Sequence, residues 1–531
     1  MIHTKRTSRG MAVAPHHLAS QAALAILRDG GNAIEAMVAA ASTIAVVYPH
    51  MNSIGGDGFW LIVKPDGETV AIDACGAAGS AVSIEAYRSR GMETIPFRGP
   101  LAANTVAGTV SGWDMALKIS QTLGGKLPLS ALLADAIHYA RNGFPVTDGQ
   151  AETTLSKLAE LKDVPGFAEV FVPQGAVPKA GDQFVNLPLA STLQSLADDG
   201  LDSFYRGALA QRIVADLAAA GSLLTIADLQ AHRAELKKPL QLAHSAGTLF
   251  NTAPPTQGLV SLAILGLLDR VGLSDVEPDS ADHVHLAVEA TKRAFGLRDQ
   301  FINDPAYMTV DPQALLAPAA LDALASGIDI AQAASWGKGK GPGDTIWMGT
   351  CDASGLSVSF IQSIYHEFGS GIVLKETGIN WQNRGASFQL DSQHLWALVP
   401  GKKPFHTLNP AAARLKDGRV MVYGNMGGDG QPQSQSAVFT RHVVFGQALQ
   451  TAITAPRWLL GRTWGKSSDS LKLESRFPVA VIEALRARGH EVDVMAAYDS
   501  ALGHAGAIVR HPDGLMEGAS DPRSDGVVAA F

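Results

Sequence analysis

The stretch that decides the fold covers residues 337–388 and reads GKGKGPGDTIWMGTCDASGLSVSFIQSIYHEFGSGIVLKETGINWQNRGASF. It begins with a Gly/Pro-rich run, GKGKGPGD, which predicts an exposed loop rather than part of a regular element. A β-type run at 345–350 follows. The turn at 352–355 then leads into a second alternating run at 356–364, so this stretch predicts two strands that are entered from a loop.

A threonine, Thr345, stands where the predicted loop meets the first predicted strand. If the chain were cut before Thr345, its hydroxyl would lie beside its own free α-amine, whose ordinary pKa of about 8 suits a base near neutral pH. An N-terminal-nucleophile enzyme needs its residue at such a junction. The alternative is an ordinary β-branched strand residue, and this stretch alone leaves that alternative open.

The composition is that of a large globular chain with no strong charge bias. The 531 residues are 46% hydrophobic, and the net charge is −8 with an isoelectric point of about 6.0. No run of like charges stands out, which argues against nucleic acid and against an anionic membrane as partners. The two cysteines, Cys75 and Cys351, provide neither a disulfide framework nor metal-site spacing.

The beginning of the chain carries basic residues but no apolar run directly after them, so we expect no secretory signal. The most apolar early segment, residues 36–47, is too short to span a bilayer. We therefore expect a cytoplasmic protein without a membrane partner.

Before the deciding stretch the sequence predicts mainly helices, together with one hairpin. Residues 17–28 and 32–47 predict two helices, the second capped by Asn32. A glycine-rich turn at 52–58 leads into a predicted hairpin of strands 59–63 and 69–73. This turn fits neither GxGxxG nor a Walker A loop, so we interpret its glycines as close backbone packing. Further helices are predicted at 112–123, 127–142, 187–198, 208–220, 227–234 and 280–303.

After the deciding stretch the sequence is rich in predicted strands, which are joined by Asp-Gly turns. Helices are predicted at about 435–451 and 478–488. Because strands and helices occur in separate runs rather than in strict alternation, we expect a layered α+β fold.

The pattern D-T-x-W-x-G-x-x-D, followed by V-S-F, F-G-S-G and T-G-I, resembles the start of the small subunit in the γ-glutamyltransferase family. The resemblance extends over nearly the whole chain. It implies a four-layer αββα sandwich of the N-terminal-nucleophile hydrolase type, with the nucleophile at the end of an inner strand. It also implies self-cleavage before Thr345 into a large subunit, 1–344, and a small subunit, 345–531, which stay together as one intertwined domain.

The resemblance also implies the residues that assist Thr345. Ser363 occupies the position of a second hydroxyl that supports the nucleophile in the family, although an ordinary strand serine is the alternative. The segment N-M-G-G-D-G resembles the family's SPGG segment. There we expect the N–H groups of Gly427 and Gly428 to form the oxyanion hole, with Asn425 next to the substrate. The alternative is a tight turn without a ligand.

The positions that bind the substrate α-carboxylate in γ-glutamyl-binding relatives differ in this chain. The arginine and glutamate of an Asp-x-Arg-Glu stretch correspond to Cys75 and Gly76, and a pair of serines corresponds to His406 and Thr407.

The positions that bind the α-amino group differ as well, because an asparagine, a glutamine or glutamate, and an aspartate correspond to Tyr365, Arg384 and Ser387. A site built around a charged group discriminates strongly, because unpaired buried polar groups are costly. A γ-glutamyl substrate should therefore fit poorly.

The replacing residues are cationic and bulky: Arg384, His406 and Tyr365, with His366 and Trp347 as further neighbours. An arginine offers a planar fork to a carboxylate, so we expect a substrate that is only an anion. The alternative is that Arg384 faces solvent.

At finer scale, segments such as GDTIWMG, WQNRGASF and VYGNMGGDGQPQ resemble the oxamate-hydrolysing branch of the family. This implies hydrolysis of oxamate to oxalate and ammonia through a threonyl ester, in purine nitrogen degradation, with no metal or organic cofactor. The expected partners are the small-molecule amide and the chain's own cleaved subunit, with a dimer of such heterodimers as an option. Two alternatives stay open: a γ-glutamyl transferase or glutaryl-type acylase, and a silent binding protein.

Overall fold

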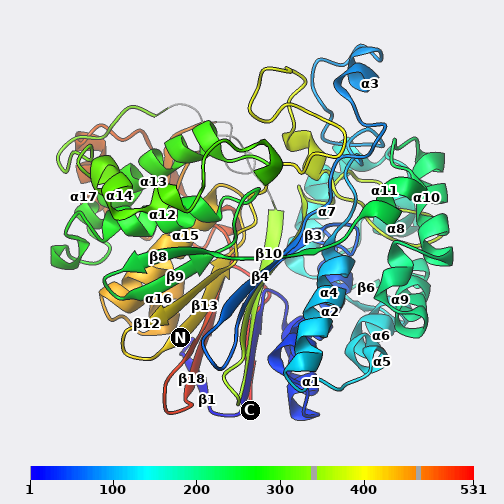
Figure 1. Ribbon diagram of the computed structural model, residues 1–531, viewed down its shortest axis with the longest axis horizontal. Helices are drawn as coiled ribbons and strands as arrows, with labels where there is room; N and C mark the ends of the chain where they lie inside the picture. Colours follow the sequence, from blue (N-terminus) through cyan, green and yellow to red (C-terminus); the bar gives the residue numbers. More distant parts are fainter. Residues whose placement is uncertain (1, 337–343, 462–467) are drawn as a thin grey trace.

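Two seven-stranded sheets lie face to face at the centre of the molecule (Figure 1). The computed structural model describes residues 2–336, 344–461 and 468–531, so the predicted loop lies outside the described residues, except for its last residue, Asp344, which belongs to a strand. The first sheet has the order β19 (Val527–Ala530), β2 (Gly10–Ala14), β10 (Asp344–Asp352), β11 (Ser357–Tyr365), β3 (Asp57–Val63), β4 (Thr69–Ala74) and β7 (Glu235–Lys237). The second sheet has the order β1 (Lys5–Thr7), β18 (Met516–Ser520), β17 (Ala505–Arg510), β13 (Val420–Asn425), β12 (Ala411–Leu415), β9 (Gly247–Asn251) and β8 (Leu240–His244).

The strands in the middle of the first sheet are buried on both faces. In β3, Phe59 and Leu61 pack in the cluster between the sheets, whereas Trp60 and Ile62 pack in the cluster under the helices. A strand covered on both faces reads as a continuous apolar run, as DGFWLIV does after its first two residues. The Trp347 ring of β10 spans the gap between the sheets and lies where a Cβ on Gly424 would collide with it.

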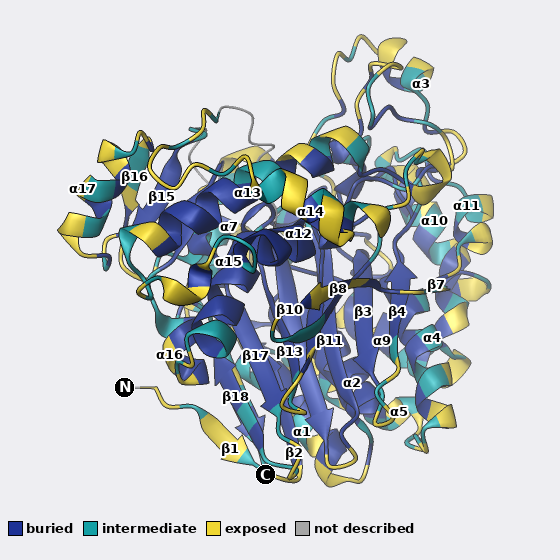
Figure 2. Cartoon of the chain, turned by 60° about the vertical axis from the view of Figure 1, so that its left-hand side comes forward, coloured by how far each residue is buried: buried dark blue, intermediate teal, exposed yellow. Residues whose placement is uncertain are grey.

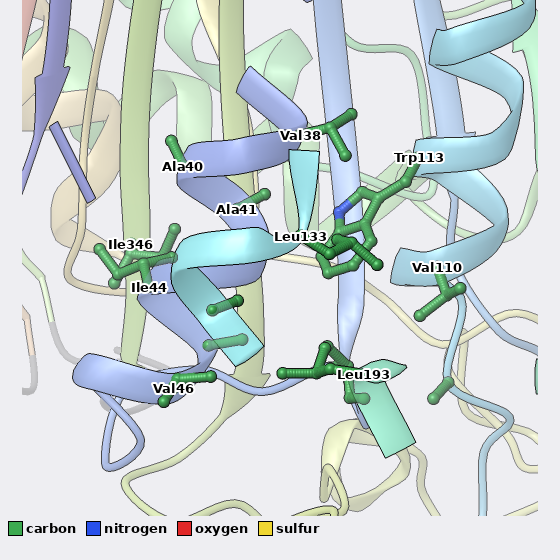
Figure 3. Close-up of a cluster of buried hydrophobic side chains, with 14 of the residues drawn as sticks. Val38, Ala40, Ala41, Ile44, Val46, Val110, Trp113, Leu133, Leu193 and Ile346 are labelled. Carbon is green, nitrogen blue, oxygen red and sulfur yellow. The ribbon is translucent and has the colours of Figure 1, made fainter. Parts of the chain in front are cut away.

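Helices cover the outer face of the first sheet, and α2 (Ala33–Val47) lies directly on it. A capping box between Asn32 and Glu35 starts α2, and all fifteen of its residues are buried. Figure 3 shows α2 side chains between Ile346 of β10 and residues of further helices, including Trp113 and Leu193. The helices on this side are α1 (His17–Arg28), α4 (Thr109–Thr122), α5 (Leu129–Leu132), α6 (Ala134–Asn142), α7 (Asp148–Leu161), α8 (Phe167–Phe171), α9 (Leu187–Asp199), α10 (Ala208–Ala220) and α11 (Ile226–Ala231).

A second helical layer covers the outer face of the second sheet, so four layers alternate as αββα (Figure 1). Figure 2 shows that the central strands are buried and that exposed residues gather on the outer sides of helices. In the described part of the chain, no helix combines the length and the apolar character that crossing a membrane requires. The helices of this layer are α12 (Gly258–Leu268), α13 (Ala281–Phe301), α14 (Pro318–Ala325), α15 (Gly430–Phe439), α16 (Leu449–Thr454) and α17 (Val479–Ala487). The remaining elements are α3 (Ile84–Arg88), the small sheet β14 (Trp458–Leu460), β15 (Leu471–Glu474) and β16 (Val492–Met495), and the pair β5 (Phe144–Pro145) and β6 (Gln183–Phe184).

The predicted four-layer fold and the predicted hairpin of β3 and β4 are confirmed. Three helix predictions had wrong limits. The helix predicted at 127–142 is divided into α5 and α6 at Leu133, and the one predicted at 227–234 ends with α11 at Ala231, before β7. The helix predicted at 435–451 starts earlier, as α15, and a π turn separates it from α16.

Candidate active site

Thr345 is the second residue of β10, and it is fully buried. The register between β10 and β11 shifts at this point, since Asp344 pairs with Tyr365 while Ile346 pairs with Gln362. Such a bulge takes one residue out of the regular ladder and re-aims its side chain, and bulges are frequent next to active sites. The local fold thus gives Thr345 a special position at the end of an inner strand.

Two polar side chains hold the hydroxyl of Thr345. Its Oγ1 donates to Ser363 Oγ over 3.4 Å, and Gln431 Nε2 donates to the same Oγ1 over 3.3 Å. Ser363 belongs to β11 and also accepts from the Tyr365 amide over 2.8 Å. The structure therefore brings together Thr345 and Ser363, as predicted, and adds Gln431 from the first turn of α15.

Gly427 and Gly428 form the turn between β13 and α15. Their φ angles are 119° and 52°, a region that favours glycine over residues with a Cβ. Within the described residues, neither of their N–H groups donates a hydrogen bond to the protein. Amides at the start of a helix attract negative charge, so this turn has the chemistry of an oxyanion site. Gln431, which contacts Thr345, follows three residues later on the same chain segment.

Arg384 is buried, with 1% of its surface exposed, so the alternative of a solvent-facing arginine is wrong. Its Nη1 donates to the Phe405 carbonyl over 3.0 Å and its Nη2 donates to Thr407 Oγ1 over 3.2 Å. In the described part of the chain, no carboxylate oxygen lies within 4.0 Å of the guanidinium, and Nε has no hydrogen-bond partner. Burial lowers the pKa of Arg384, and the neighbouring Tyr365 and Asp57 partly oppose that shift.

Tyr365 lies under this guanidinium, whose Cζ is 3.6 Å from the centre of the tyrosine ring. The contact has cation–π geometry. The φ angle of Tyr365 is 83°, which is strained for a residue with a Cβ, and such strain is common at functional sites. Burial raises the pKa of the Tyr365 hydroxyl. The end of β11 therefore places an aromatic platform for Arg384 two residues after Ser363.

His406 is paired with a carboxylate that the sequence did not single out. Its Nε2 lies 2.9 Å from Asp57 Oδ2, and both side chains are buried. The other oxygen of Asp57 accepts from the amides of Gly76 and Gly108 and from Gln382 Nε2. Burial raises the pKa of Asp57 to about 6. Burial and the nearby Arg384 hold the pKa of His406 well below its ordinary value. His406 is therefore a neutral ring bonded to Asp57, rather than a second cation.

Asn425 is buried at the end of β13, just before the glycine turn. Its Oδ1 accepts from Arg457 Nη1 over 3.4 Å, and its Nδ2 has no partner within the described residues. Arg457 also donates to the Gly503 carbonyl over 2.8 Å. Asn425 therefore contacts Arg457, and these hydrogen bonds do not connect it to Thr345 or Arg384.

A buried ion pair adjoins the glycine turn. Arg298 of α13 donates through Nη1 to Asp429 Oδ1 over 2.9 Å, and Asp429 is the residue just before α15. Sequence reasoning missed Asp57, Gln431 and this pair. For Asp57 there was a signal, because an acidic residue opens the otherwise apolar strand DGFWLIV.

Two buried groups in the described part of the chain have donor atoms close enough for a metal ion: Asp57, Cys75 and His406, and, separately, His285, Glu289 and His490. In the first group, one possible metal-ligand atom each of Asp57 and His406 is already used in the hydrogen bond between them. Arg384 and Lys403 also place positive charge nearby.

In the second group His285 Nδ1 and His490 Nε2 are bonded to each other over 2.8 Å, and Glu289 holds Lys292. Hydrogen bonds within the protein thus account for donor atoms of every residue in this group.

Two stacked sheets between helical layers, with a threonine at the start of an inner strand, define the architecture of N-terminal-nucleophile hydrolases. The sequence model of the family described as gamma-glutamyltranspeptidase matches residues 19–531, and the chain belongs to this family. An oxamate amidohydrolase proenzyme from Klebsiella pneumoniae is 64% identical, with both chains covered completely. A glutathione hydrolase-like YwrD proenzyme from Bacillus subtilis is 40% identical, with 99% of each chain covered. A solved cephalosporin acylase from Bacillus halodurans superposes with a TM-score of 0.92 at 34% identity, covering 100% of this chain and 97% of that one.

Proposed function

We propose that this chain is a self-processing amidohydrolase that converts oxamate and water to oxalate and ammonia. The observation that carries the proposal is the buried guanidinium of Arg384, which has no carboxylate partner in the described chain and which faces Thr407 and Tyr365. A buried cation without a counter-ion favours an anionic ligand. Oxamate supplies a carboxylate and an amide and carries no amino group, and the relative named for oxamate hydrolysis is 64% identical.

Processing at the Asp344–Thr345 bond is part of this proposal. Cleavage there would give the subunits 1–344 and 345–531, with Thr345 as the new N-terminus. Both parts contribute strands to both sheets: β10 and β11 of the small part lie between β2 and β3 of the large part. The cleaved parts would therefore stay together as a heterodimer, because separating them would break both sheets.

The geometry supports a reaction in two steps. The α-amine of Thr345 takes the proton of Oγ1, and Oγ1 attacks the amide carbonyl while Ser363 and Gln431 hold it in place. The amides of Gly427 and Gly428 bind the oxyanion, and one such donor typically contributes about 3–4 kcal/mol in the transition state. Ammonia leaves with the proton from the α-amine. Water then hydrolyses the ester on Thr345 and releases oxalate.

Arg384 binds the carboxylate of the substrate in this scheme. The fork already donates to Thr407 and to the Phe405 carbonyl, which fixes its orientation. Tyr365 supports its face. Burial and the nearby Arg384 keep His406 as a neutral ring, so the positive charge of the site is concentrated on Arg384.

A second candidate is a hydrolase or transferase acting on a larger carboxylate-bearing acyl group. It is favoured by the likeness to the cephalosporin acylase and to the glutathione hydrolase-like relative. The positions at which γ-glutamyl-binding relatives hold an α-amino group carry Tyr365, Arg384 and Ser387 here, and none of these is a carboxylate. We therefore rank this candidate second.

Ammonia release from oxamate by the purified protein tests the proposal. It is compared with p-nitroaniline release from a γ-glutamyl anilide and with hydrolysis of a glutaryl amide. We expect efficient turnover of oxamate alone, and intact mass measured on the same sample should give the two fragments. Turnover of the anilide or the glutaryl amide without oxamate hydrolysis would replace the first candidate by the second.

A further inference from the structure

A cavity lies at the opposite end of the strands from Thr345. It has a volume of about 700 Å³ and is formed by turns of both sheets, including those after β3, β8, β10 and β12. Its charged lining is dominated by cations, because one carboxylate, Asp66, stands among the basic side chains of Lys64, Arg414, Lys416, Arg419 and Arg510. Such a concentration is unusual in a chain whose net charge is −8.

Only part of this positive charge is neutralised by neighbouring carboxylates. Lys64 pairs with Glu68 over 2.6 Å and Arg419 pairs with Asp417 over 2.7 Å. Arg414, Lys416 and Arg510 have no carboxylate within 4.0 Å in the described part of the chain. Three cations around one cavity are therefore available to an external anion.

Arg510 is the most informative of the three. It ends β17, its guanidinium lies against the Gly355 turn, and its Nε is buried without a hydrogen-bond partner. A buried N–H group without an acceptor is costly, and a charge-assisted bond to an oxyanion would satisfy the guanidinium. Arg414 also lines the cavity, and its Nη1 donates to the Gly67 carbonyl over 2.9 Å. Hairpin turns thus fix the guanidinium groups of Arg414 and Arg510 at the cavity in advance.

We propose that this cavity binds a small oxyanion with two or more negative charges, of the phosphate or polycarboxylate type. The site is separate from the candidate active site, because β10 runs from Thr345 at one end to Asp352 at the other, a distance of about 23 Å. The proposal does not depend on the reaction at Thr345.

Isothermal titration of the purified protein with pyrophosphate, and separately with citrate, tests this site. We expect saturable binding of one anion per chain, weakened by added salt. Arg510→Gln and Lys416→Gln should each raise Kd about tenfold or more, since each removes a charge-assisted contact. Lys416 is exposed, so its variant should fold normally even if Arg510→Gln does not. Tighter binding of pyrophosphate would identify a phosphate site, and tighter binding of citrate a carboxylate site.

Two control variants test whether the anion binds at this cavity rather than at other positively charged residues. Arg486→Gln, on the exposed face of α17, should leave Kd unchanged, and Arg384→Ala should leave it unchanged as well. The proposal is overturned if neither anion binds, if Lys416→Gln binds as tightly as the wild type, or if Arg384→Ala abolishes binding. The last result would place the anion at the active site instead.

Discussion

At the scale of single residues, substrate choice rests on the fork of Arg384. A hydrogen bond to a charged group contributes about 1.5–3 kcal/mol, and about 1.4 kcal/mol is one decade of rate. Arg384→Ala should therefore lower kcat/KM for oxamate about ten- to a few-hundredfold. Arg384→Lys should recover only part, because an ammonium cannot reproduce the planar fork. Ammonia release measures both, with Arg486→Ala, at an exposed arginine of α17, as the matched control.

Self-cleavage should survive both changes at Arg384, since that step acts on the chain's own peptide bond. If Arg384→Ala is processed normally and hydrolyses oxamate as fast as the wild type, the carboxylate site lies elsewhere.

Asp57 gives a second prediction at this scale, through its raised pKa. Burial makes ionisation harder in the folded protein, with a pKa of about 6, than in the unfolded chain, where it is near 3.8. Between these values the folded state binds more protons, so this group lowers stability as pH rises through the window. The change amounts to about 3 kcal/mol, because one pKa unit corresponds to about 1.4 kcal/mol.

The measurement compares Asp57 with Asp57→Asn, both in a Thr345→Ala background that keeps one chain. From pH 4 to pH 6 the melting temperature of the Asp57→Asn variant should rise relative to that of the protein with Asp57. Above about pH 7 the difference between the two should stay constant. A difference that is flat across the whole range would contradict the assignment of a raised pKa to Asp57.

How much of the site was predictable also depends on single residues. The family resemblance predicted Ser363, and its proximity to Thr345 agrees with the short turn that joins their two strands. The partner of His406 could not be predicted from the sequence, since Asp57 lies 349 residues away in the chain. Local patterns carry no information on such a long-range pair.

At the scale of elements, α15 shows why its limits were mispredicted. All ten residues of the helix are buried, although its first seven, GQPQSQS, are polar or small. The sequence reads as a surface turn, because hydrophobic periodicity is absent. In the structure, Gln433 donates to the Leu460 and Asp429 carbonyls, and Gln435 donates to Asn409. Side-chain hydrogen bonds to distant backbone replace the apolar stripe.

The start of α15 also depends on the pair of Arg298 and Asp429, which joins it to α13. Removing one partner of a buried pair typically costs about 3–5 kcal/mol. Arg298→Gln should therefore lower the melting temperature, and it should lower kcat more than it raises KM, because the glycine turn is displaced. Arg293→Gln, five residues earlier on α13 and not among its buried residues, is the matched control.

The double variant Arg298→Gln/Asp429→Asn should regain stability, because it removes the uncompensated charge. Its kcat should stay low, because the ion pair that orients the turn is still missing. Recovery of full activity in the double variant would show that the pair does not position Gly427 and Gly428.

At the scale of the whole molecule, the layered fold was predictable and the strand order was not. Separate runs of strands and helices, together with the family resemblance, predicted the four-layer sandwich that the structure has. The order within the sheets joins strands from the two ends of the chain: β2 lies between β19 and β10, and β1 pairs with β18. These contacts form only in the complete fold, so no local segment of the sequence specifies them.

That interleaving leads to a prediction for the processed protein. Under denaturing conditions, intact mass should show fragments 1–344 and 345–531. Size exclusion under native conditions should show one species, since both fragments contribute strands to the first sheet. Thr345→Ala should remain a single inactive chain, because it lacks the attacking hydroxyl, and Thr345→Ser should be cleaved more slowly than the wild type. If the wild type stays uncleaved yet hydrolyses oxamate, the α-amine of Thr345 is not the base. Fragments that separate without denaturant would show that the two sheets do not hold them together.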